Sequence, residues 1–323
     1  MNAGAILVAS LMVTLANPGT WVLGLVAFLL RGGLLVVLAP IVVIPSILGV
    51  ANVVAPALTS FVFTGGSTEL VVLAILWIAG LLVWLVVGGA LAATMELALI
   101  RAVAADDDVD VQLPEPRDGL GSQVARILAV RLVAHLPLVL ALSFGLVSIV
   151  QVAYRELTLP ADVVTPVVFR IIRGAPLALA LIVLAWMLGE VLGGLAVRSL
   201  VMGGRSVVRA SGSAAATMVR RPITTAALAF APLVAFVLVV VPSAMAASAT
   251  WNAVRAALAN EAGPLVSTSL VFVFVGLWVG GLALLGAVAA WRSAAWTVGT
   301  ARTFGGAALP ERGTDNGSVA LAP

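Results

Sequence analysis

Six long apolar stretches constrain this chain more than any other feature of its sequence. Each has about the 20 residues that an α-helix needs to cross a hydrocarbon core about 30 Å thick. They cover residues 20–45, 70–93, 132–153, 175–197, 223–247 and 265–290. Strands open to lipid would leave backbone groups unpaired, and the stretches lack the alternation of a barrel. The sequence therefore predicts an all-α polytopic transmembrane helix bundle with six spans.

The composition excludes several classes of function. Hydrophobic residues make up 62% of the chain and charged residues 10%, whereas soluble domains carry about 25% charged residues. All 17 basic residues are arginines, and the formal net charge is only +3, so no nucleic-acid partner is expected. Without lysine there is no Walker A site, and without cysteine there is no disulfide, thiolate metal site or cysteine nucleophile.

Similar features recur along the chain at intervals that predict three helix hairpins. Each hairpin has a short lead-in and then a proline, followed by a tryptophan about 50 to 60 residues later and an arginine 23 or 24 residues after the tryptophan. The three sets are Pro18, Trp77 and Arg101; Pro137, Trp186 and Arg209; and Pro222, Trp278 and Arg302. We expect one transmembrane domain over 1–303, with repeats 1–110, 120–210 and 211–303, and a disordered tail over 304–323. Alternatively, Arg31-Gly32-Gly33 forms a turn, which would give seven spans.

The arginines predict the orientation in the membrane. In the six-span arrangement one side carries twelve of them, and the other side carries Arg155, Arg170, Arg173 and Arg255. Because cytoplasmic segments are enriched in Lys and Arg, both termini are expected in the cytoplasm of a multi-pass cell-membrane protein.

Small residues one turn apart occur on the three returning helices, as Gly89 with Ala93, Gly189 with Gly193 and Gly276 with Gly280. Such pairs let helix backbones approach closely in lipid. We expect these faces to pack inside the bundle; the alternative is a homodimer seam.

Arg31 is the most informative polar residue because it falls near the middle of the first span, where a charge costs at least about 2.5 kcal/mol. Its expected partner is Glu190 in the fourth span, with Glu96 at the end of the second span as a weaker candidate. Gln151 occupies roughly the equivalent position in the second repeat. These four residues are the candidate ligand-binding site for an ion, a substrate or an anionic lipid headgroup; the alternative is a structural ion pair or an arginine at a helix break.

Other polar residues have simpler interpretations. The acidic run from Asp106 to Asp118 lacks the ligand spacing and turn glycine of an EF-hand, so no metal site or other cofactor is expected. Asp118-Gly119 and Ala125-Arg126 are separated by the wrong spacing for a CDP-alcohol phosphotransferase motif. His135 is interpreted as an interfacial histidine, and the basic segment 198–221 as a topology-fixing loop that could lie on anionic lipid.

The lead-ins, prolines and hairpins, with the contexts Asn17-Pro18 and Arg221-Pro222, loosely resemble the membrane domain of glycerophosphoryl diester phosphodiesterases and related uncharacterised bacterial six-span families. The resemblance implies a catalytic barrel attached to the membrane part, as in those phosphodiesterases. We expect no soluble domain in this chain that could form such a barrel. We therefore expect a non-enzymatic membrane protein that binds or transports a small or lipidic ligand. The alternative is a structural or partner-binding subunit that associates with other membrane proteins.

Overall fold

The chain forms helices throughout the part that a computed structural model describes, which is residues 3–38, 41, 68–106, 109, 113–114, 119–158 and 167–304. The helices are α1 (Ala3–Ala16), α2 (Gly19–Phe28), η1 (Leu29–Gly33), α3 (Leu34–Leu38), α5 (Thr68–Val83), η2 (Trp84–Gly88), α6 (Gly89–Ala104), α7 (Leu120–Ala134), α8 (Leu136–Thr158), α9 (Val167–Gly174), α10 (Pro176–Gly203), α11 (Val207–Arg220), α12 (Pro222–Ala259) and α13 (Pro264–Phe304). No strand occurs among these residues. Apart from Phe304, the predicted tail lies outside the described residues.

Six helical stretches in the described ranges are long and apolar enough to cross a membrane: Gly19–Leu38, Val71–Ala104, Leu136–Glu156, Pro176–Gly203, Pro222–Ala259 and Pro264–Ala301. The predicted all-α fold with six spans is confirmed, and the protein is an integral membrane protein. The last two spans have 38 residues each, about 57 Å at 1.5 Å per residue. They continue beyond the predicted ends because hydropathy marks only the part of a helix that faces lipid.

The predicted lead-ins are the helices α1, α7 and α11. Pro18 precedes α2, Pro137 is the second residue of α8, and Pro222 begins α12. Proline is tolerated there because the first turn of a helix has no partner for its N–H groups. The threefold internal repeat itself stays a prediction.

The buried core lies where these lead-in helices meet the ends of the returning spans. We call this region the hub; α1 packs on α13, α7 on α6 and α10, and α11 on α10. Its fully buried apolar residues include Ile100, Ile127, Val130, Val197, Ala210 and Val298. The indole of Trp291 on α13 also donates to the carbonyl of Leu7 on α1 at 3.2 Å, so polar contacts reinforce the packing.

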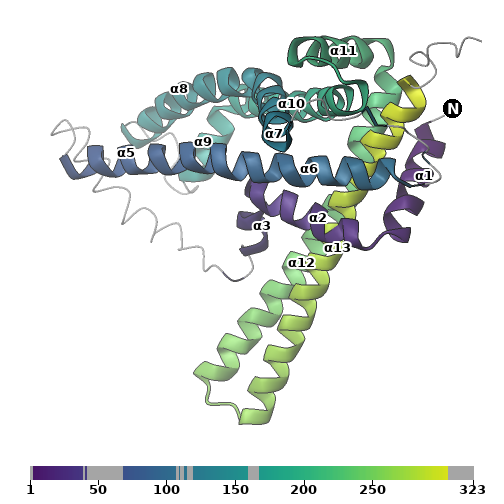
Figure 1. Ribbon diagram of the computed structural model, residues 1–323. Helices are drawn as coiled ribbons and strands as arrows, with labels where there is room; N and C mark the ends of the chain where they lie inside the picture. Colours follow the sequence, from purple (N-terminus) through teal and green to yellow (C-terminus); the bar gives the residue numbers. More distant parts are fainter. Residues whose placement is uncertain are drawn as a thin grey trace, which may run out of the picture.

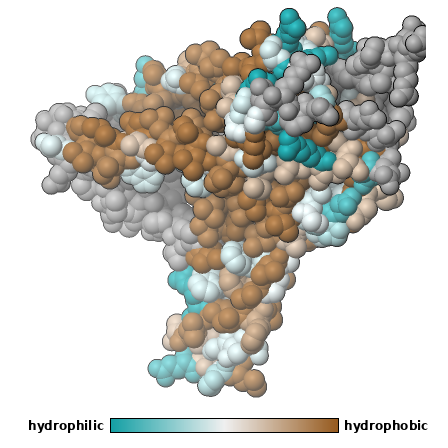
Figure 2. Space-filling model, in the orientation of Figure 1, coloured by the Kyte–Doolittle hydropathy of each residue, from teal (hydrophilic) through white to brown (hydrophobic). Residues whose placement is uncertain are grey.

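The spans diverge away from the hub (Figure 1). The rod formed by α5, η2 and α6 runs in one direction with α8 and α10, whereas the α12–α13 hairpin projects in another. Side chains on the outer parts of these spans are apolar and exposed, and they form the brown surface of Figure 2. Such surfaces are the ones expected to face lipid, where apolar side chains need no further burial.

The first and last spans approach each other through two glycines. An added Cβ on Gly24 of α2 would lie 2.7 Å from the backbone N of Ala290, and one on Gly286 of α13 would lie 2.5 Å from the carbonyl O of Trp21. Both obstacles are backbone atoms, which cannot swing aside. Only glycine therefore fits at either position of this crossing.

Two of the three small-residue faces expected to pack inside the bundle do so, and the third does not. A Cβ on Gly89 would meet Leu128 of α7 at 2.9 Å, and Cβ atoms on Gly189 and Gly193 would meet the side chains of His135 and Arg131. These two faces are packed inside the bundle, as predicted. The prediction is wrong for Gly276 and Gly280, which are exposed and have no described atom within 4 Å of a Cβ position. They lie on a face of α13 that is turned away from α12 and α3, which the neighbouring Trp278 and Gly281 contact.

We predict that Gly24→Leu and Gly286→Leu each lower the thermal unfolding midpoint in detergent, followed by tryptophan fluorescence. Overpacking typically costs about 1–3 kcal/mol, and contact with backbone favours the upper part of that range. Gly80→Leu is the matched control, since Gly80 lies on an exposed face of α5 with nothing near its Cβ position. Equal midpoints for all three variants would contradict the close crossing.

Candidate anion-binding site

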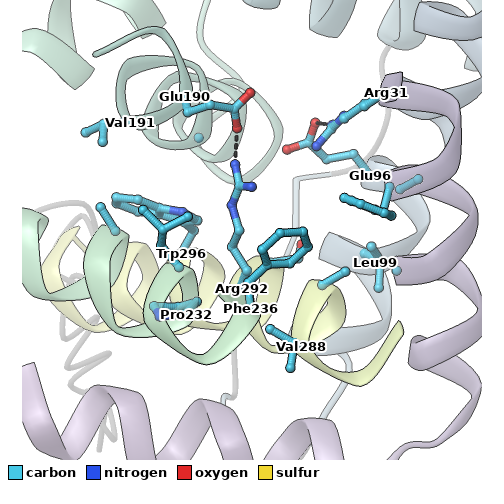
Figure 3. Close-up of a pocket in the computed structure, with 18 of the residues that line it drawn as sticks. Arg31, Glu96, Leu99, Glu190, Val191, Pro232, Phe236, Val288, Arg292 and Trp296 are labelled. Atoms are coloured by element: carbon cyan, nitrogen blue, oxygen red, sulfur yellow. Dashed lines mark hydrogen bonds and ion pairs between the residues drawn. The ribbon is translucent and has the colours of Figure 1, made fainter. Parts of the chain in front are cut away.

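A cavity of about 220 Å³ lies between the hub and the diverging spans. Residues of α2, η1, α6, α7, α10, α12 and α13 line it. Figure 3 shows the labelled side chains around it, with Glu190 and Arg292 directed toward each other and Arg31 beside Glu96. All charged groups of the lining are arginines or glutamates: Arg31, Arg131, Arg198, Arg292, Glu96 and Glu190.

Glu96 on α6 is the centre of the charged network. Its side chain is only 3% exposed and forms ion pairs with three guanidinium groups, those of Arg31, Arg131 and Arg198. Arg131 donates to both carboxylate oxygens, at 2.5 and 3.2 Å, and Arg198 donates to Oε1 at 2.6 Å. Both acceptor atoms are therefore occupied, and the carboxylate is fixed from three sides.

Arg198 is buried almost completely, with 2% of its side chain exposed. Besides the bond to Glu96, it donates to the hydroxyl of Ser293 on α13 at 2.7 Å and to the carbonyl of Gly194 at 3.2 Å. Hydrogen bonds of this kind offset the cost of burying a charge. Arg198 thus joins α10 to both α6 and α13.

Arg31 reaches Glu96 because the first span breaks at this residue. The backbone departs from helical geometry at Arg31 and Gly32, and Gly32 has φ = +97°, a conformation that residues with a Cβ rarely adopt. The ring of Phe28 occupies the space where Gly33 would have a Cβ. A third of the Arg31 side chain stays exposed, so this guanidinium remains accessible from the cavity.

Glu190 on α10 is the second carboxylate and is 21% exposed. It is paired with Arg292 of α13, and Nη1 of Arg131 lies 3.8 Å from it. His135 contacts it at 3.4 Å through Nε2, while Nδ1 of the same ring lies 2.8 Å from the carbonyl of Arg131. A carbonyl only accepts, so Nδ1 carries a proton.

Arg131 connects the two carboxylates into one network. It lies outside the spans, on α7. Burial acts against its charge, but the carboxylates of Glu96 and Glu190 outweigh this effect and raise its pKa above the ordinary value. Gly193 gives its side chain room on α10, since a Cβ there would lie 2.9 Å from Nη1.

The charges of the lining do not balance. Four guanidinium groups face two carboxylates, which leaves an excess of two positive charges among the described residues of the cavity wall. Charge in a region that excludes water is costly unless it is compensated. The cavity is therefore electrostatically suited to an anion, and the saturated carboxylate of Glu96 is poorly suited to a metal cation.

Apart from Ser293, the rest of the wall is apolar or aromatic. It includes Trp186, Trp296, Phe28, Phe236 and Leu233. The rings of Phe28 on α2 and Phe236 on α12 contact each other, with centroids 5.3 Å apart. A ligand that fills this space would meet arginines on one side and hydrocarbon surface on the other.

Three of the four candidate residues lie together around this cavity. Arg31, Glu96 and Glu190 all line it, but Arg31 is paired with Glu96 and not with the expected Glu190. The residue thought to be the weaker candidate is the better placed one, because the break at Gly32 directs Arg31 toward α6. Gln151 is exposed on α8 and is not part of the lining.

Arg131, Arg198 and Arg292 are three of the twelve arginines whose placement predicts the cytoplasmic side, and the prediction from the sequence gives no role in the site to them or to His135. Two spacings could have indicated their role. Arg131 and His135 are four residues apart and therefore share a face of α7. Glu190 and Arg198 are two helical turns apart on α10, with Gly193 and Gly194 between them.

No cluster of three or more His, Asp or Glu side chains that could hold a metal occurs in the described part of the chain. Of the acidic run, Asp106 is described, and its carboxylate accepts from the amide of Asn17 at 2.9 Å. Asp107, Asp108 and Asp110 lie outside the described residues.

We predict that Glu96→Gln lowers stability by roughly 3–5 kcal/mol, because it leaves three guanidinium groups without their shared counter-charge. Glu190→Gln should cost less, since this carboxylate is more exposed and has Arg292 as its one close guanidinium partner, with Arg131 at 3.8 Å. The readout is the thermal unfolding midpoint in detergent. Glu261→Gln, at the exposed turn between α12 and α13, is the control; a midpoint for Glu96→Gln equal to that of the control would contradict the central role of Glu96.

Comparisons with models of protein families, with curated proteins and with solved structures gave no match to this chain. The resemblance to the membrane domain of glycerophosphoryl diester phosphodiesterases stays a prediction.

Proposed function

We propose that this integral membrane protein binds an anionic small or lipidic ligand in the arginine-lined cavity and acts as a non-enzymatic binding or transport protein. The observation that carries this proposal is the excess of two positive charges around a space of about 220 Å³ with apolar walls. The excess charge and the cavity together favour ligand binding over a structural ion pair, because a structural ion pair needs neither an uncompensated charge nor an open volume.

The charged side chains differ in how much of their surface is exposed, which supports different roles for them. Arg198 and Glu96 are 2% and 3% exposed and form the fixed part of the network. Arg31 and Arg292 have 33% and 40% of their side chains exposed. These two guanidinium groups can therefore bind an incoming anion while each keeps its contact with a glutamate.

We also propose that the cavity lies toward the cytoplasmic side, with both termini in the cytoplasm. The start of α1 and the end of α13 lie near each other at the hub end of the molecule (Figure 1). The same end carries α7 and α11, whose arginines are Arg126, Arg131, Arg209 and Arg220. This distribution agrees with the enrichment of arginine in cytoplasmic segments.

A partner-binding subunit is the second candidate function. The outer part of the α12–α13 hairpin projects from the other helices (Figure 1). Gly276 and Gly280 of α13 are exposed and have no described atom within 4 Å of their Cβ positions. A partner helix could pack closely there. Purification from native membranes in a mild detergent tests it: a second chain at fixed stoichiometry supports this function.

The direct test is native mass spectrometry of the protein released from lipid nanodiscs that contain anionic and zwitterionic lipids. We predict that the wild type retains an anionic species, and that Arg31→Ala or Arg292→Ala reduces its retention by about tenfold or more, as expected for loss of one charge-assisted contact. Each glutamate keeps at least one other arginine in these variants, so folding should be preserved.

Arg209→Ala is the matched control, because Arg209 is exposed on α11 and lies outside the cavity. It removes the same charge from the same end of the molecule. If all three variants lose the anion equally, the binding is a surface effect and the proposal fails. If the wild type retains no anion, the network is structural and the partner-binding function becomes the better one.

A further inference from the structure

A second, smaller cavity of about 40 Å³ lies along three of the spans that also line the arginine-lined cavity, namely the first span, α12 and α13. Val36 and Val37 of α3 line it, together with residues of α12 and α13. The complete lining from the hairpin is Val240, Ser243, Ala244, Ala247, Leu277, Trp278, Gly281, Leu282 and Leu285. Ser243 is the single polar side chain besides the indole of Trp278, whose N–H donates to the carbonyl of Val37 at 3.2 Å.

The two cavities follow each other along the helices. On α12 the first cavity ends at Phe236 and the second runs from Val240 to Ala247. At 1.5 Å per residue the second begins about 6 Å beyond Phe236 and ends about 16 Å beyond it. On α13 the order is the same, with Val288 at the first cavity and Leu285 at the second.

From the first cavity to the second, the lining changes from charged to apolar, in the same order as a membrane lipid changes from headgroup to tail. Arginines lie at the hub end, the paired rings of Phe28 and Phe236 come next, and an apolar slot follows toward the middle of the hairpin. A hydrocarbon chain that starts at the arginines would pass the two rings and enter the slot. A small polar anion would occupy the first cavity alone and leave the second unused.

The charge of the first cavity indicates the kind of headgroup. A phosphate monoester carries about −1.5 to −2 charges at pH 7, which matches the excess of two guanidinium groups. A phosphate diester has one charge and would leave part of this excess uncompensated. Guanidinium groups also bind the free oxygens of a phosphate in pairs, and a monoester offers one more such oxygen than a diester.

We propose that the ligand is a lipid phosphomonoester, with its phosphate among Arg31, Arg131 and Arg292 and its hydrocarbon chain in the slot between α3, α12 and α13. This inference rests on the proposed function, and it adds the chemical class of the headgroup and the site of the tail.

The test uses nanodiscs of phosphatidylcholine with either phosphatidic acid or phosphatidylglycerol of the same acyl chains, and glycerol 3-phosphate as a headgroup without a tail. Retention is measured by native mass spectrometry. The wild type should retain phosphatidic acid about tenfold better than phosphatidylglycerol. Equal retention of the two lipids would overturn the headgroup assignment.

Gly281→Leu tests the tail site, because a Cβ on Gly281 points at Ser243 from 3.2 Å and a leucine would fill the slot. Gly280→Leu is the matched control, because no atom of the described residues lies within 4 Å of the Cβ position of this neighbouring glycine. We expect Gly281→Leu to lose phosphatidic acid about tenfold while binding glycerol 3-phosphate like the wild type, and Gly280→Leu to change neither.

Ala244→Leu fills the slot from the opposite helix and should reproduce the result of Gly281→Leu. Unchanged phosphatidic acid binding in both slot variants would overturn the tail site and leave anion binding intact. Loss of glycerol 3-phosphate in both would also count against it, because the two cavities would then not be separable. If the wild type retains an anion in the test of the proposed function but binds no phosphate compound here, the phosphomonoester inference fails and the proposed function stands. If it retains no anion in either experiment, both fail.

Discussion

Glu96 and its three arginines hold the inner ends of the spans together. The carboxylate lies on α6, and the guanidinium groups come from η1, α7 and α10. Apolar contact gives helices little net drive to associate in lipid, because the alternative surroundings are equally apolar. Charged groups that water cannot reach have no such alternative. The network therefore supplies the specificity of packing that hydrophobic burial supplies in soluble proteins, and the cavity exists because these side chains fix the surrounding helices.

The same arrangement explains why the site is polar at one end and apolar at the other. Arginines gather beside the hub, whose core is buried by the lead-in helices, and the spans separate beyond it. Glycines set the distances: Gly193 and Gly189 admit the side chains of Arg131 and His135. Small residues thus serve two purposes in this protein, since they bring backbones together at one crossing and make space for charged side chains at another.

The all-α fold and the six spans could be predicted from the sequence, because hydropathy reports on exposure to lipid, which is a local property. The ends of α12 and α13 could not be predicted in this way. A helix that leaves the membrane keeps its backbone hydrogen bonds while its hydropathy falls. Arg31, Glu96 and Glu190 could be selected as costly charges near or within spans. Their pairing could not be predicted, because it depends on the φ of Gly32 and on how the first, second and fourth spans converge. Arg198 and Arg292 escaped notice for a related reason: an arginine near a span end has the same sequence signature whether it faces water or a buried carboxylate.

The close crossing of α2 and α13 has a consequence for biosynthesis. Gly24 and Gly286 belong to the first and last spans, so the contact between them can form only after nearly the whole chain has been translated and inserted. Until then α1 lacks the helix on which it mainly packs, and α2 has only its contact with α6 of the second span. Arg31 can pair with Glu96 at that stage, but the cavity wall beside it is incomplete. The binding cavity is therefore a product of the final insertion step, and a ribosome that stops before α13 releases a chain without it.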